Sequence, residues 1–149
     1  MIAALGVMAM VFVASCTDYD ADDLVGNWYY QSVSVKTQGT DNDTSYTTSE
    51  PALFRDMTFF EDRVARVETL SLTQESEPNY VLDSYRWSLS SSGNRITLTA
   101  NNLIDMQWDV KTLNSSKLVF TYTMHRHSGG TEKATYTYTR QNRSNSRPR

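Results

Sequence analysis

Apolar and polar residues alternate with a period of two along most of the chain between Trp28 and Arg140. Such alternation predicts β-strands with one buried and one exposed face, and helical periodicity is nearly absent. Thr, Tyr, Val and Phe are frequent in the alternating segments, as they are in strands. The segments are 28–37, 53–61, 63–72, 80–90, 94–100, 104–113, 117–127 and 132–140. The sequence therefore predicts an all-β domain.

Short polar links separate most of these eight segments, for example residues 91–93 and 114–116. Because sequential strands with short links are antiparallel neighbours, we expect a meander. Eight strands are enough to close a barrel, which also removes the unpaired edges of the sheet. The exception is Thr37–Pro51, a long polar segment without apolar periodicity. Loops of this length are usually functional or disordered. We expect an eight-stranded antiparallel meander that closes into a small barrel.

The N-terminal segment, residues 1–14, is entirely apolar, and Cys16, the chain's only cysteine, follows it closely. The run is too short to span a bilayer, which takes about 20 residues, and is typical of a secretion signal. The sequence VASC at residues 13–16 resembles the lipobox of bacterial lipoproteins. This resemblance implies cleavage before Cys16 and acylation of its thiol. We expect a lipid anchor in the bacterial cell envelope, in the outer membrane, with the leaflet left open. The alternative is a free cysteine buried in a core segment.

Acidic residues cluster directly after this cysteine, at Asp18, Asp20, Asp22 and Asp23. They resemble the short acidic signal that sends lipoproteins to the cell surface in some Gram-negative gut bacteria. A solvated tether explains them equally well, because clustered like charges stay extended.

Four regions follow from these patterns: a signal peptide at 1–15, an acidic tether at 16–23, a barrel domain at 24–140 and a disordered basic tail at 141–149. The tail is polar and holds no apolar residue to anchor it. The net charge of −3 argues against a nucleic-acid partner.

The sequence Gly26-Asn27-Trp28, at the start of the first predicted strand, resembles the Gly-x-Trp motif that opens lipocalins. The stretches at 87–98 and 108–120 are similar to those of short bacterial lipocalin-like lipoproteins. The resemblance implies that Trp28 packs across the closed end of the barrel with Arg140 over its ring. A guanidinium over an indole gains about 0.5–2 kcal/mol. The resemblance to lipocalins also implies that the long first loop, Thr37–Pro51, covers the open end of the barrel.

Metal and catalytic sites are weakly indicated. His125 and His127 share one face of a predicted strand, and we expect an exposed strand end there, because a third metal ligand is lacking. Residues 41–45 mimic the start of a calcium loop, but Tyr46 and Ala52 stand where glycine and glutamate are needed. No nucleophile elbow, phosphate loop or zinc signature occurs. We expect no enzyme activity, no cofactor and no metal site.

Inward-facing aromatic residues remain as the candidate ligand pocket: Trp87, Trp108, Phe120, Tyr122, Tyr136 and Tyr138. They either pack the core or line a pocket, since apolar concave sites are built from such rings. Our leading hypothesis is a membrane-anchored barrel that binds a small apolar or amphipathic ligand. The alternative is a structural or protein-interaction lipoprotein with a filled barrel. A cavity of about 300 Å³ between the strands distinguishes the two.

Overall fold

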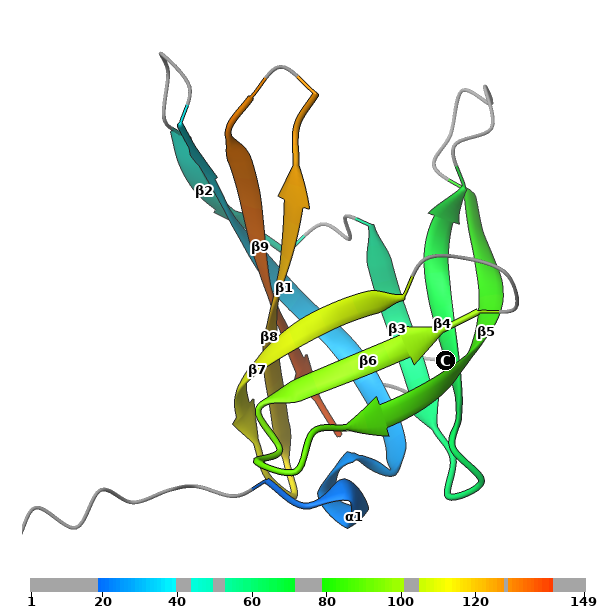
Figure 1. The fold of residues 1–149 in the computed structure, drawn as a ribbon. Coiled ribbons are helices and arrows are strands. Elements are labelled where there is room, and N and C mark those ends of the chain that lie inside the picture. The colour runs from blue at the N-terminus through cyan, green and yellow to red at the C-terminus, as the bar shows by residue number, and fades with distance from the viewer. Residues whose placement is uncertain are drawn as a thin grey trace, which may run out of the picture.

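The computed structural model of this chain describes residues 19–39, 44–49, 53–71, 79–100, 105–127 and 129–140. In these residues one antiparallel sheet of nine strands closes into a barrel (Figure 1). The elements are α1 (Ala21–Leu24), β1 (Gly26–Gln38), β2 (Thr44–Thr48), β3 (Phe54–Phe59), β4 (Val64–Ser71), β5 (Asn79–Leu89), β6 (Arg95–Thr99), β7 (Met106–Leu113), β8 (Lys117–His125) and β9 (Thr131–Thr139). The predicted all-β meander is confirmed. Predictions for Cys16, the signal segment and the basic tail fall outside the described residues.

The long strand β1 closes the barrel. Its first residues pair with β3, and from Tyr29 onward it pairs with β9. Pairing with β3 ends at Trp28, where β1 turns away. Two residues further on, the backbone N–H of Tyr30 donates instead to the Asp56 carboxylate at 2.8 Å. A side chain thus takes the place of a backbone partner where the two strands separate.

The expectation of an uninterrupted loop at Thr37–Pro51 is wrong in its middle. Residues Thr44–Thr48 form β2, which pairs with β1 from Val33 to Thr37 and adds a ninth strand outside the barrel of eight. The composition TSYTT favours a strand. The sequence pattern does not reveal this strand. None of its side chains is fully buried, so its residues show no alternation of apolar and polar side chains.

One end of the barrel, here called the α1 end, holds α1 and the turns β3–β4, β5–β6 and β7–β8 (Figure 1). Leu24, the last residue of α1, is completely buried there. Tyr19 and Ala21 also pack against the core, so this segment of the predicted acidic tether lies on the barrel. Within the described residues, no helix has the length and apolar character that crossing a membrane requires.

Candidate functional site

Trp28 and Arg140 meet at the α1 end, although they stand at opposite ends of the domain sequence. The Arg140 Cζ atom lies 4.2 Å from the centroid of the Trp28 ring, so the expected cation–π contact is present. Arg140 also donates to the backbone oxygens of Val25, at 2.7 Å, and of Asp23. The Trp28 Nε1–H donates to the oxygen of Leu24 at 2.8 Å. One guanidinium therefore joins the end of β9 to the segment between α1 and β1.

Burial lowers the pKa of the Arg140 guanidinium from its ordinary value, and the charge of Asp23 opposes this effect. Because arginine stays protonated in proteins, the group remains a cation. Its role at this end is structural, since its hydrogen bonds go to the backbone of its own chain.

An aromatic stack fills the middle of the barrel. Trp108 lies flat on Phe120, with ring centroids 4.1 Å apart and an angle of 5° between the planes. Phe120 also stacks with Tyr136 and Tyr138, with ring centroids 5.3 Å and 5.7 Å apart. Phe54 crosses from β3 and contacts Trp108 at 5.1 Å. These four stacked rings and Phe54 are almost completely buried, so this part of the interior is packed.

Tyr122 lies at the margin of the stack. It is partly buried, and its ring centroid is 5.6 Å from that of Phe54. The structure thus brings five of the six predicted pocket residues together: Trp108, Phe120, Tyr122, Tyr136 and Tyr138. Sequence reasoning missed Phe54, because an inward phenylalanine in a strand signals only burial.

The sixth residue, Trp87, lies apart at the α1 end. Its Nε1–H donates to the backbone oxygen of Phe60 at 3.0 Å, and Arg63 lies over its ring at 4.4 Å. It also meets Phe59 edge to face. Alternation predicts the face of the sheet toward which a side chain points. It does not predict the position of that side chain along the barrel axis, because the strands are tilted. Trp87 therefore packs at the α1 end, apart from the stack, where it also lines a cavity of about 330 Å³ beside α1.

Three tyrosine hydroxyls are among the polar groups of the interior, those of Tyr30, Tyr136 and Tyr138. Burial raises the pKa of Tyr138 well above its ordinary value and has the same effect on Tyr136. Burial and the nearby Tyr80 raise the pKa of Tyr30 to about 12. All three are neutral phenols at physiological pH, so they present hydrogen-bonding groups without charge.

Two polar atoms of the stack have no hydrogen-bond partner among the described residues: Nε1 of Trp108 and the hydroxyl of Tyr138. Buried polar groups are almost always paired, and each exception calls for an explanation. An indole N–H can only donate, whereas a phenol can donate and accept. A partner for the Trp108 N–H would have to be an acceptor atom, whereas the Tyr138 hydroxyl could take a donor or an acceptor.

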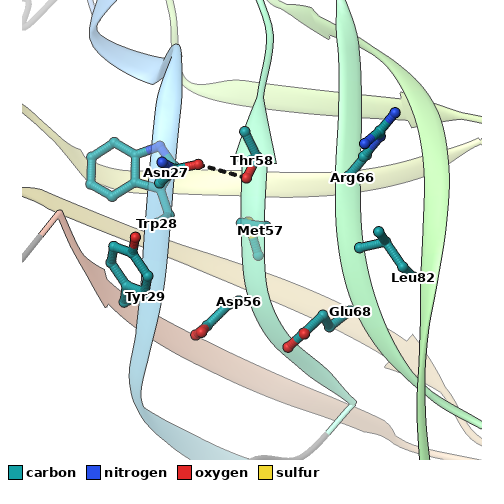
Figure 2. A pocket seen from close by; sticks show the side chains of 9 residues that line it. All are labelled: Asn27, Trp28, Tyr29, Asp56, Met57, Thr58, Arg66, Glu68 and Leu82. Atoms are coloured by element: carbon teal, nitrogen blue, oxygen red, sulfur yellow. Dashed lines mark hydrogen bonds between the residues drawn. The ribbon is translucent and has the colours of Figure 1, made fainter. Parts of the chain in front are cut away.

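A hollow of about 220 Å³ opens on the side of the barrel where β1 leaves β3 (Figure 2). Asn27 and Thr58 lie across its rim and are joined by a hydrogen bond of 2.8 Å. Trp28 and Met57 also line it, together with Glu68 and the exposed Leu82 of the neighbouring strands. Its walls carry acidic side chains, the basic side chain of Arg66 and apolar side chains. This lining does not indicate one class of ligand.

Two further cavities, of about 300 and 330 Å³, flank α1 and share Ala21 and Arg63 in their walls. They reach the size of a ligand site, but they lie between α1 and the turns, not between the strands. A groove of about 230 Å³ runs over the outer face of β1, β7, β8 and β9. None of these three hollows is lined by the aromatic stack.

The structure describes one of the two metal positions that the sequence analysis considered. His125 and His127 are exposed at and just beyond the end of β8. In the ranges that the structure describes, no three His, Cys, Asp or Glu side chains gather to hold a metal ion. The calcium-like residues Asp41 and Asp43 lie outside those ranges.

The chain is similar to solved structures, but no similarity to a known sequence was found. No protein-family model and no curated protein sequence matches the chain. A deswapped triple mutant of bovine odorant-binding protein is similar at 11% identity and a TM-score of 0.46, covering 80% of this chain and 74% of that one. Lobster apocrustacyanin A1 is similar at 10% identity and a TM-score of 0.47, covering 82% and 63%. Bovine odorant-binding protein in complex with a selenium-containing odorant is similar at 10% identity and a TM-score of 0.47, covering 86% of this chain and 76% of that one. Likenesses of this extent carry no conclusion about ligand or activity.

Proposed function

We propose that this chain is a lipid-anchored protein of the bacterial cell envelope whose barrel binds a small, largely apolar ligand that carries a polar oxygen. The observation that carries the binding proposal is the pair of unpartnered groups in the aromatic stack, Trp108 Nε1–H and the Tyr138 hydroxyl. A ligand oxygen would supply the acceptor that the indole lacks, and the surrounding rings would cover the apolar part of the ligand.

The packing restricts where such a ligand can bind. A separation of 4.1 Å between Trp108 and Phe120 leaves no room between these rings. Tyr122 is only partly buried and borders Phe54, so it is the side chain of the set whose displacement costs least. We therefore place the ligand against the stack on the side of Tyr122, with that ring moving aside as it enters.

Titration of the full chain carrying Cys16→Ala tests this function. The probes are a fatty acid, a retinoid and a haem-like molecule, each followed by tryptophan emission and by melting temperature. A ligand at a hundredfold excess over Kd stabilises the folded state by about 2.7 kcal/mol. Trp108→Phe keeps a ring in the stack and removes the N–H donor, so it should weaken binding about tenfold. The matched control is Trp87→Phe at the α1 end, outside the stack, which should leave the affinity unchanged; a loss of affinity in this variant alone would place the ligand in the cavity beside α1 and overturn the proposed site.

The anchor is tested separately in the native host. Cys16→Ala should move the protein from the membrane to the soluble fraction, and the wild-type chain should carry acyl mass on Cys16. A mutant that stays in the membrane, together with an unmodified wild type, would refute the anchor and leave the binding proposal standing.

A second function, a protein-interaction lipoprotein with a filled barrel, is favoured by a different observation. The stack packs the middle of the barrel, while Leu82 on the outer face of β5 is 60% exposed and Tyr46 on β2 is 56% exposed. Saturable probe binding supports the ligand function. No change in emission or melting temperature with any of the three probes favours the interaction function.

A further inference from the structure

The outer groove over β1, β7, β8 and β9 is lined by three lysines, Lys36, Lys111 and Lys133. All three are exposed. They point away from the core, since their neighbours Val35, Val110 and Ala134 are buried on the inner face. This site is separated from the aromatic stack by the barrel wall. We call it the lysine groove.

Strand register places two of these lysines directly opposite each other. Lys36 on β1 and Lys133 on β9 are Cα partners in the antiparallel ladder. Like charges in this position repel each other and destabilise the sheet. An anion bound between or above the two ammonium groups would offset this repulsion.

No carboxylate of the described residues neutralises the lysines. Asp109 lines the same groove, but its carboxylate is paired with Arg95 at 3.2 Å. Glu132, next to Lys133 in sequence, pairs with Arg126. Among the described residues, none of the three lysines takes part in an ion pair. The groove is thus a concentration of positive charge on a chain whose net charge is −3.

Hydroxyl groups form the base of the groove. Thr121 is only 8% exposed although it faces outward, so it lies at the bottom. Its Oγ1 is 3.0 Å from Oγ1 of Thr135, and Ser34 is the register partner of Thr135 on β1. A hydrogen bond between two hydroxyls uses one of their two protons, so one O–H is left to donate outward.

Ammonium groups around hydroxyl donors are the surroundings that an oxyanion prefers, because charge-assisted hydrogen bonds are the stronger ones. A concave surface with an excess of positive charge also concentrates anions, and this groove holds three lysines against one carboxylate, that of Asp109, which is paired with Arg95. We propose that the lysine groove binds a phosphate or sulfate ester of a small polyhydroxylated molecule, such as a sugar phosphate. The lysines hold the oxyanion, and the Ser and Thr hydroxyls contact the rest of the molecule. This site is independent of the proposed ligand in the barrel.

The test is a titration of the full Cys16→Ala chain, followed by amide chemical shifts and by calorimetry. The probes are glucose 6-phosphate, inorganic phosphate and glucose. Saturable shifts should centre on Thr121, Thr135 and Ser34 with glucose 6-phosphate. Inorganic phosphate should bind at the same residues more weakly, because it lacks the sugar that the Ser and Thr hydroxyls contact; equal binding would overturn the polyhydroxylated part of the proposal. Glucose should not bind.

The variants Lys36→Gln and Lys133→Gln should each weaken glucose 6-phosphate binding at least tenfold. Each should also keep or raise the melting temperature, because the repulsion across the ladder is removed. Lys117→Gln, an exposed lysine at the start of β8 outside the groove, is the matched control and should bind as the parent does. No saturable shift with either phosphate, equal binding of glucose, or unchanged affinity in both groove variants overturns the proposal.

Discussion

A Cβ atom placed on Gly26 would lie 2.5 Å from Nη1 of Arg140. Gly26 also has a φ of 129°, a conformation that other residues rarely adopt. The glycine of the Gly-x-Trp sequence is thus required twice, once by the backbone and once by the guanidinium that lies over Trp28.

Gly26→Ala should therefore lower the free energy of unfolding by about 1–3 kcal/mol for the backbone strain, with an added cost for moving Arg140. Urea denaturation measures the sum. The double variant Gly26→Ala/Arg140→Ala separates the two costs, because it removes the clash and keeps the strain. If the two substitutions prove simply additive, the contact between these residues plays no part.

Gly93 provides a test of how firmly the N-terminal segment is held. It has a φ of 71°, and a Cβ atom there would lie 2.3 Å from the backbone oxygen of Tyr19. Gly129 has a similar φ of 88° and nothing within 4 Å of its Cβ position. Gly93→Ala should lower the melting temperature more than Gly129→Ala and should speed amide exchange in α1. Equal effects of the two variants would mean that Tyr19 contributes nothing to stability.

Phe120 is the centre of the aromatic stack, and Phe120→Ala should cost about 3–5 kcal/mol, because the cavity it leaves is bounded by large rings. Phe60 is the matched control, since it is 37% exposed in the turn between β3 and β4. Phe60→Ala should cost about 1 kcal/mol or less. Chemical denaturation of both variants gives the difference, and comparable losses would show that the stack is not the core of the domain.

Stability should fall in alkaline solution. Unfolded tyrosines lose their protons near pH 10, whereas the pKa of Tyr30 is raised to about 12 and burial also raises the pKa values of Tyr136 and Tyr138. The folded state then binds more protons than the unfolded state, so stability is complete below pH 10 and decreases as pH rises above it.

Tyr138→Phe should make this decrease shallower, because it removes the most deeply buried of these phenols. At pH 7 it should leave the free energy of unfolding unchanged or slightly higher, since the hydroxyl has no partner to lose among the described residues. Urea denaturation at pH 7 and pH 11 checks both expectations. A loss of more than about 1 kcal/mol at pH 7 would reveal a hydrogen bond at this hydroxyl.

Period-two alternation was enough to predict the eight barrel strands, because each has one face on the core. It missed β2, whose residues Thr44–Thr48 are stabilised by pairing with β1 and not by burial. Trp28 and Arg140 were matched through the family resemblance, and no local pattern links residues so far apart.

Side-chain positions along a strand were harder to predict than their faces. Trp87 and Trp108 both point inward, yet one packs at the α1 end and the other in the stack. The lysine groove depends on register, since Lys36 and Lys133 become neighbours only when β1 pairs with β9. Register is set by the whole barrel and cannot be read from either strand alone.

Two contacts hold Tyr19 at the α1 end of the barrel. Its hydroxyl donates to the backbone oxygen of Lys111 at 2.8 Å, and its backbone lies against Gly93. Cys16 stands three positions earlier in the sequence, and three extended residues reach at most about 11 Å. An acylated Cys16 would therefore hold the α1 end close to the lipid headgroups, with the opposite rim of the barrel directed into the aqueous compartment. A ligand would then arrive from solution, and lipids diffusing laterally in the same bilayer would have no direct route to the aromatic stack.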